Sequence, residues 1–114
     1  MWVRLGSFTV KPGQEAQLSS VYNGQAVPKV RASPGNLGCL LLEPATAGDA
    51  SVIACTFWAT PADADAYESS GTAQQVVGLV RQYFAGPPAL KSYLSESHAG
   101  LPTSPGGELC RAGL

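Results

Sequence analysis

The sequence predicts an α+β domain of the ferredoxin-like kind, in which a four-stranded antiparallel sheet carries helices on one face. β-Branched and aromatic runs alternate with amphipathic helical stretches in the order β-α-β-β-α-β. The two middle strands, 37–43 and 51–58, are separated by a loop short enough for a hairpin. The chain has 114 residues, which is the size of one domain.

The N-terminal part supplies one strand and one helix. Residues 2–10 alternate in the manner of a strand, with Ser7 on the face opposite Phe8. A turn at Lys11-Pro12-Gly13 leads into a helix whose apolar residues keep helical spacing. Gly24 and Pro28 predict a kink or a break in that helix.

The second half repeats the pattern with shorter helices. Thr60 followed by Pro61 and, at the third position, Asp63 is typical of a capped helix start after the strand 51–58. Ser69-Ser70-Gly71 ends that helix, and residues 72–84 carry a second apolar stripe. After a Gly-Pro-Pro turn, residues 89–95 form the last strand.

Composition excludes several classes of partner. The net charge is −1 and there is no basic run, so we expect no nucleic-acid partner. No apolar run is long enough to cross a bilayer, and the start of the chain lacks a signal-peptide layout, so we expect no membrane partner. Three cysteines without Cys-x-x-Cys spacing indicate free thiols and a cytoplasmic protein.

Two of the cysteines fall in the predicted hairpin. Counting across its loop places Cys39 roughly opposite Cys55. A cross-strand disulfide is one interpretation, and two small buried thiols are the interpretation we favour for a cytosolic protein. The acidic residues Asp63 and Asp65 are explained by helix capping, so we expect no metal site.

The strand 37–43 supplies leucines to both faces of the sheet. The sheet face that the helices leave uncovered is therefore too apolar to remain in water, which predicts a homodimer through that face. From residue 97 onward the composition changes to Gly, Pro and Ser. We expect one domain over residues 1–96 and a poorly ordered or partner-contacting tail over residues 97–114.

Aromatic side chains gather around the 51–58 strand and the following helix. Phe57 and Trp58 end the strand and Tyr67 lies on the helix, which makes them candidates for the wall of a site for a flat aromatic ligand. Packing in the core is the other interpretation, since large aromatics dominate cores generally. Tyr22, on the first helix, is a candidate for the opposite wall.

Four short motifs in this order resemble the antibiotic biosynthesis monooxygenase family of small dimeric α+β barrel proteins, over roughly residues 2–95. The motifs are Phe8-Thr9-Val10-Lys11-Pro12-Gly13, Arg31-Ala32-Ser33-Pro34-Gly35, Phe57-Trp58 before a helix with an aromatic near its middle, and Gly86-Pro87-Pro88. The resemblance implies a homodimer whose sheets pack into a barrel, with a pocket in each subunit between sheet and helices.

Many members of that family oxidise polycyclic phenols, anthrones or hydroquinones with dioxygen and without metal or flavin. The resemblance therefore implies a cofactor-independent monooxygenase for a planar aromatic, quinol or anthrone-like molecule. Trp58 matches the family's strand-end tryptophan, and Tyr67 falls where relatives often carry a histidine or another aromatic. These two are the predicted catalytic residues, and the predicted substrate-binding residues are Tyr22, Phe57 and Ser7.

Other members degrade haem, with an asparagine on the first strand and a histidine on the helix after the tryptophan. Here Ser7 stands at the comparable strand position, and the histidine of this chain, His98, follows the last strand. Haem degradation is therefore the third expectation. The second is a small-molecule-binding or structural dimer that keeps the fold without the chemistry.

Overall fold

The computed structural model describes residues 1–96, so the predicted tail, with His98 and Cys110, lies outside the described residues. The ferredoxin-like order of elements is confirmed. The elements are β1 (Trp2–Thr9), α1 (Glu15–Val21), a π-helical turn (Tyr22–Ala26), α2 (Val27–Arg31), β2 (Asn36–Leu42), β3 (Ser51–Trp58), α3 (Pro61–Ser69), α4 (Thr72–Val80), a 3-10 turn (Arg81–Tyr83) and β4 (Ala89–Leu94).

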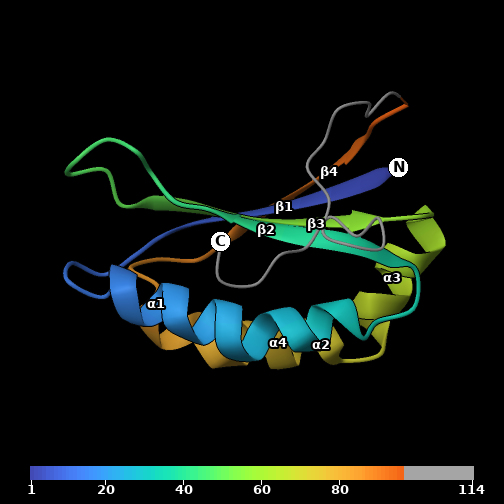
Figure 1. Ribbon diagram of the computed structural model, residues 1–114, viewed down its shortest axis with the longest axis horizontal. Helices are drawn as coiled ribbons and strands as arrows, with labels where there is room; N and C mark the ends of the chain where they lie inside the picture. Colours follow the sequence, from blue (N-terminus) through green and yellow to red (C-terminus); the bar gives the residue numbers. More distant parts are fainter. Residues whose placement is uncertain (97–114) are drawn as a thin grey trace.

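The strands form one antiparallel sheet in the order β2-β3-β1-β4. β1 lies between β3 and β4, so the first and last strands of the chain are neighbours. Within residues 1–96, all the helices cover the same face of this sheet and leave the other face open (Figure 1). In the part of the chain that the structure describes, no helix is long and apolar enough to cross a membrane.

The predicted irregularity of the first helix is present as a π-helical turn between α1 and α2. Pro28 has no backbone N–H, so it cannot donate to the carbonyl of Gly24 one α-helical turn earlier. The helix widens just before it, and the N–H of Val27 donates to the carbonyl of Tyr22. The chain therefore stays helical through the proline, and Tyr22 is 3% exposed at the start of the widened turn.

The predicted cap of α3 is also confirmed. Thr60 Oγ1 accepts a hydrogen bond from the Asp63 backbone N–H at 3.2 Å and donates one to the Asp63 carboxylate at 2.9 Å. Asp63 also lies against the backbone of Gly35, which precedes β2. The same side chain thus closes the start of α3 and packs against the chain entering the sheet.

The two cysteines of the hairpin lie one position out of register, which corrects the predicted juxtaposition. Cys39 pairs with Thr56, and Cys55 pairs with Leu40. Because side chains alternate along a strand, Cys39 faces the helices and Cys55 faces the open side of the sheet. Both are buried free thiols, and the sheet between them prevents a disulfide.

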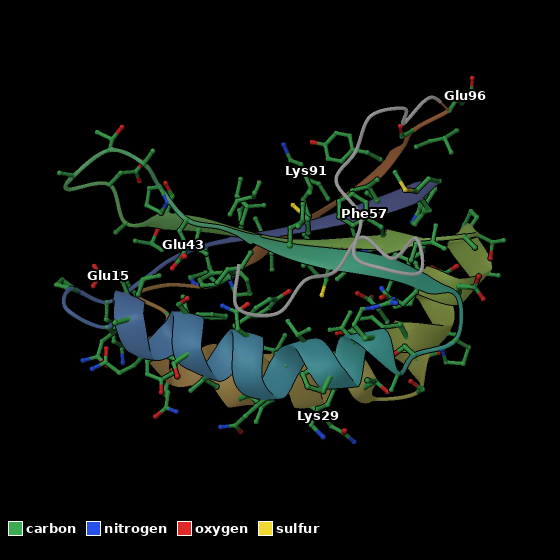
Figure 2. All side chains as sticks on the ribbon, in the orientation of Figure 1. Glu15, Lys29, Glu43, Phe57, Lys91 and Glu96 are labelled. Atoms are coloured by element: carbon green, nitrogen blue, oxygen red, sulfur yellow. The ribbon has the colours of Figure 1, made fainter. Side chains whose placement is uncertain are left out.

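The core lies between the sheet and the helices. Its largest fully buried side chains are Trp58, Leu18, Val10 and Val30. The open face is also apolar, and its side chains point away from the helices, as those of Phe57 and Lys91 do in Figure 2. We call the following residues the open-face cluster: Val3, Leu5, Leu40, Leu42, Ile53, Phe57 and Tyr93.

Two glycines with similar backbone conformations give a matched test of the Asp63 contact. Gly35 and Gly71 have φ of 79° and 90°, in the region that disfavours other residues. A Cβ on Gly35 would lie 2.1 Å from Asp63 Cγ, whereas a Cβ on Gly71 would meet nothing within 4 Å.

We therefore expect Gly71→Ala to lower the free energy of unfolding by about 1–2 kcal/mol through backbone conformation. Gly35→Ala should lose a further 1–3 kcal/mol, roughly, because Asp63 must leave the Thr60 cap. Urea unfolding of both variants measures the difference. Equal losses would show that Asp63 moves aside without cost.

Candidate functional site

A cavity of about 250 Å³ lies between the helix-facing side of the sheet and the helices. Carbon atoms make up most of its wall. Its lining residues come from both strands at the centre of the sheet, from all the helical segments except α1, and from β4 and the chain leading into it. They are Arg4, Gly6, Phe8, Tyr22, Val30, Ala54, Thr56, Tyr67, Glu68, Ala73, Gln74, Val76, Val77, Val80, Arg81, Phe84, Pro88 and Leu90.

The cavity exists because the residues at the centre of the sheet have small side chains. Gly6 on β1 and Ala54 on β3 are directly paired, and both face the helices. Neither residue has a side chain long enough to reach α3 or α4. A Cβ on Gly6 would already lie 3.3 Å from the side chain of Leu90. Small residues at one cross-strand pair therefore leave space that larger residues would fill.

Four aromatic rings line this space. Phe8 and Phe84 pack together, with ring centroids 4.2 Å apart and planes tilted by 34°. Tyr22 enters from the π-helical turn and Tyr67 from α3. The structure thus brings the predicted residues Tyr22 and Tyr67 to the same cavity, together with two phenylalanines that the sequence analysis did not single out.

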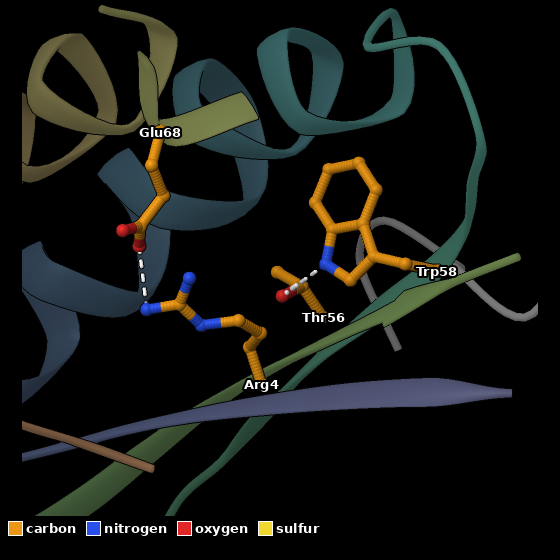
Figure 3. A network of polar contacts seen from close by, with 4 residues as sticks. All are labelled: Arg4, Thr56, Trp58 and Glu68. Carbon is orange, nitrogen blue, oxygen red and sulfur yellow. Dashed lines mark hydrogen bonds and ion pairs between the residues drawn. The ribbon is translucent and has the colours of Figure 1, made fainter. Parts of the chain in front are cut away.

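Trp58 supports the cavity from behind. It is 0% exposed and lies outside the lining. Its ring packs against Tyr67, with centroids 4.9 Å apart and planes tilted by 38°. Its indole Nε1–H donates to Thr56 Oγ1 at 2.8 Å (Figure 3). Since Tyr67 and Thr56 do line the cavity, Trp58 acts on the site through the two residues that it holds.

Ser7 and Phe57 are not brought to the cavity. Ser7 follows Gly6 on β1, and Phe57 precedes Trp58 on β3, so alternation turns both side chains to the open face. Adjacent residues of one strand cannot both line a cavity on one side of the sheet. Contrary to the sequence prediction, Phe57 and Trp58 therefore do not form one wall of the cavity. Tyr67, Tyr22 and Phe8 form the wall instead.

The protonation of Tyr67 follows from its surroundings. Burial raises the pKa of its phenol well above the ordinary tyrosine value, and the nearby Cys39 and Glu68 raise it further, while Arg4 opposes them. Tyr67 is therefore a neutral phenol near neutral pH. A neutral phenol donates a hydrogen bond and does not accept a proton from a substrate, which argues against the role of general base.

Charged groups also reach the cavity. The guanidinium of Arg4, on β1, lies 2.6 Å from the carboxylate of Glu68, on α3 (Figure 3). Arg81 lines the cavity as well, from the exposed 3-10 turn. The sequence analysis singled out neither arginine as a site residue. The signal in the sequence was an arginine on the face of a strand that meets the helices. Which face of the strand meets the helices could be established only from the pairing of the strands.

The comparisons with solved structures agree with this fold. A protein from Bordetella bronchiseptica, provisionally named an antibiotic biosynthesis monooxygenase, has 24% identity and a TM-score of 0.69, with 82% of this chain and 95% of that chain covered. A Nitrosomonas europaea protein of unknown function has 21% identity and a TM-score of 0.69, with 90% and 95% covered. No curated protein matches.

A variant of SnoaB, a cofactor-independent oxygenase from Streptomyces nogalater, has 15% identity and a TM-score of 0.70, with 87% of this chain and 96% of that chain covered. At these identities the likenesses define the ferredoxin-like α+β class and no more. The sequence profile described as antibiotic biosynthesis monooxygenase matches residues 1–79. The chain belongs to the antibiotic biosynthesis monooxygenase family, as its motifs predicted.

The raised pKa of Tyr67 predicts how stability depends on alkaline pH. In the unfolded chain a tyrosine ionises near about pH 10, whereas in the folded protein Tyr67 stays protonated to higher pH. The stability that the folded protein gains from the protonated Tyr67 is thus fully present below about pH 10 and is lost as the pH rises further. We expect Tyr67→Phe to reduce the alkaline loss of stability, measured by urea unfolding across that range. An unchanged pH profile would show that Tyr67 ionises as in the unfolded chain.

Proposed function

We propose that this protein is a cofactor-independent monooxygenase that acts on a planar aromatic, quinol or anthrone-like molecule with dioxygen. The observation that carries the proposal is the cavity between sheet and helices, with its aromatic and aliphatic walls, in a member of this family. Ligand sites of this kind are typically apolar with a small number of polar groups that set orientation.

The size of the cavity supports a small aromatic substrate. A cavity of about 150 Å³ holds one benzene ring. The 250 Å³ found here therefore has room for a larger flat molecule, such as two fused rings. Phe8, Phe84, Tyr22 and Tyr67 offer ring faces and edges against which such a molecule packs.

The proposed reaction balances without a cofactor. The substrate loses a proton to water and becomes an electron-rich anion, which gives one electron to dioxygen. The substrate radical and superoxide then combine into a peroxide, which takes up a proton. For an anthrone, loss of water from this hydroperoxide turns the methylene into a carbonyl, so that one dioxygen yields one carbonyl and one water. The protein's part is to exclude water, hold the ring and stabilise the anion.

Tyr67 is the proposed donor to that anion. Its neutral phenol lines the cavity, and within residues 1–96 its hydroxyl makes no hydrogen bond that a substrate would have to break. Trp58 holds the Tyr67 ring in place from behind. We therefore assign Tyr67 direct contact with substrate and Trp58 a positioning role. Ser7 and Phe57 are left out of the proposed site because the sheet separates them from it.

Oxygen uptake by metal-free protein, with a chelator present, tests this proposal. We expect uptake above the protein-free rate with some members of a panel of hydroquinones and anthrones. Tyr67→Phe should lower that rate by roughly 100-fold or more if its hydroxyl stabilises the developing anion. Tyr93→Phe, which removes a hydroxyl from the open face, is the matched control and should keep the rate.

The second candidate is a protein that binds such a molecule without oxidising it. It is favoured by the part of the cavity wall that residues 1–96 form, which presents no histidine to take the substrate's proton. Saturable binding of panel compounds without oxygen uptake would establish this candidate. Uptake that Tyr67→Phe leaves unchanged would keep the monooxygenase and remove Tyr67 from its mechanism.

We also propose that the protein is a homodimer through the open-face cluster. Leu42 and Tyr93 are each 48% exposed in the single chain, and Phe57 lies in the same apolar surface. A second copy of this face is an apolar partner of matching size, so the pairing would remove both surfaces from water.

Phe57→Glu should convert the dimer into a monomer, because a carboxylate buried between apolar faces is not compensated. Sedimentation equilibrium measures the change, with Gln75→Glu on the exposed surface of α4 as the control. A wild-type monomer, or a Phe57→Glu variant with the wild-type mass, would refute the assignment of this face.

A further inference from the structure

The cavity wall carries a positive charge that packing against an aromatic ring does not require. Arg4 places a guanidinium in a wall made mostly of carbon, and its side chain is only 17% exposed. A charge that is largely withdrawn from water is costly unless a counter-charge or hydrogen bonds compensate it. The compensating group is the carboxylate of Glu68, at 2.6 Å.

A purely structural role accounts poorly for this pair. The Glu68 side chain is 38% exposed, and pairs with such exposure add little stability. An apolar side chain at position 4 would join β1 to α3 at least as well, since replacing partly buried ion pairs by packed apolar residues is often neutral or stabilising. Packing of β1 against α3 therefore does not explain why position 4 carries a charged side chain that is costly to desolvate.

The guanidinium also keeps capacity for a second anion. Its described contact joins one nitrogen, Nη2, to one carboxylate oxygen of Glu68. A guanidinium carries further N–H donors in a rigid plane. Within residues 1–96 these donors of Arg4 make no other hydrogen bond, and Arg4 lines the cavity beside Tyr67.

We propose that Arg4 is the anion-binding residue of this cavity and that the preferred ligand is a planar aromatic with an ionised oxygen, a phenolate or an enolate. Glu68, on α3, is the counter-ion of this guanidinium when no ligand is bound, and it competes with the ligand for the positive charge. Arg81 lies at the exposed rim, so among residues 1–96 Arg4 is the sheltered positive charge of the cavity. This inference rests on the proposed function, because it names the chemical form in which that site takes its substrate.

Binding of para-nitrophenol tests the inference without requiring turnover, since its ionised and neutral forms absorb at different wavelengths. Para-nitroanisole is the matched neutral probe. With wild-type protein we expect the phenolate to bind more tightly than the anisole, and the bound phenol to ionise at lower pH than in water. Arg4→Gln should weaken phenolate binding by roughly 10–100-fold, since an adjacent guanidinium shifts an acid's pKa by about 1–2 units.

The same variant should bind para-nitroanisole as the wild type does, which also shows that its cavity is folded. In Arg4→Gln the bound phenol should ionise at higher pH than in water, because an apolar cavity disfavours the charged form. Arg4→Lys should retain most of the preference for phenolate. Lys91→Gln removes one positive charge from the opposite face of the sheet and should change neither affinity.

Glu68→Gln separates the proposal from a structural ion pair. If Arg4 binds the ligand, removal of the competing carboxylate leaves phenolate affinity equal to the wild type or higher. If the pair is only structural, Arg4→Gln and Glu68→Gln break the same contact and lower phenolate affinity equally, which would overturn the proposal. Wild-type protein that binds the anisole as tightly as the phenolate would also overturn it, with the proposed function intact. Protein that binds neither probe would overturn both.

Discussion

The pairing of β1 with β3 is the constraint on which the rest of the structure depends. Once Gly6 lies opposite Ala54, alternation assigns Arg4 and Phe8 to the helix side and Ser7 to the open side. A shift of one residue would exchange these sets, placing the arginine on the open face and filling the space above the sheet. The cavity, its charge and the apolar face behind it are thus consequences of one register.

The order of elements was readable from the sequence because it depends on local signals. The Thr60 cap, the Pro12-Gly13 turn and the apolar stripes each act within a few residues, and each was found where predicted. Register is different, because no local signal specifies which residues of separate strands meet. Counting across the hairpin loop placed Cys39 opposite Cys55, whereas an offset of one residue in the pairing of β2 with β3 puts them on opposite faces.

The residues that line the cavity were predicted in part for the same reason. Tyr22 and Tyr67 were identified because aromatic residues on the inner faces of two helices converge whatever the strand register is. Phe57 was misplaced because an aromatic pair was treated as one unit, although neighbours in a strand point in opposite directions. Arg4 and Glu68 are separated by 64 positions, and only the folded chain shows that they meet.

The π-helical turn has a consequence for how the first helix tolerates change. Leu18 and Val30 are both 1% exposed, yet residues twelve apart on a regular α-helix are roughly 120° out of phase. The extra residue in the widened turn absorbs about 100° of rotation, which returns both side chains to the core. Insertions and deletions in this helix are therefore not equivalent. Loss of one residue between Tyr22 and Ala26 leaves Leu18 and Val30 eleven positions apart, which a regular α-helix brings to within about 20° of each other, so the shortened helix is regular and keeps both side chains on the core. At its present length the helix keeps the hydrophobic stripe continuous only through the irregular turn, and one further inserted residue would turn one half away from the core.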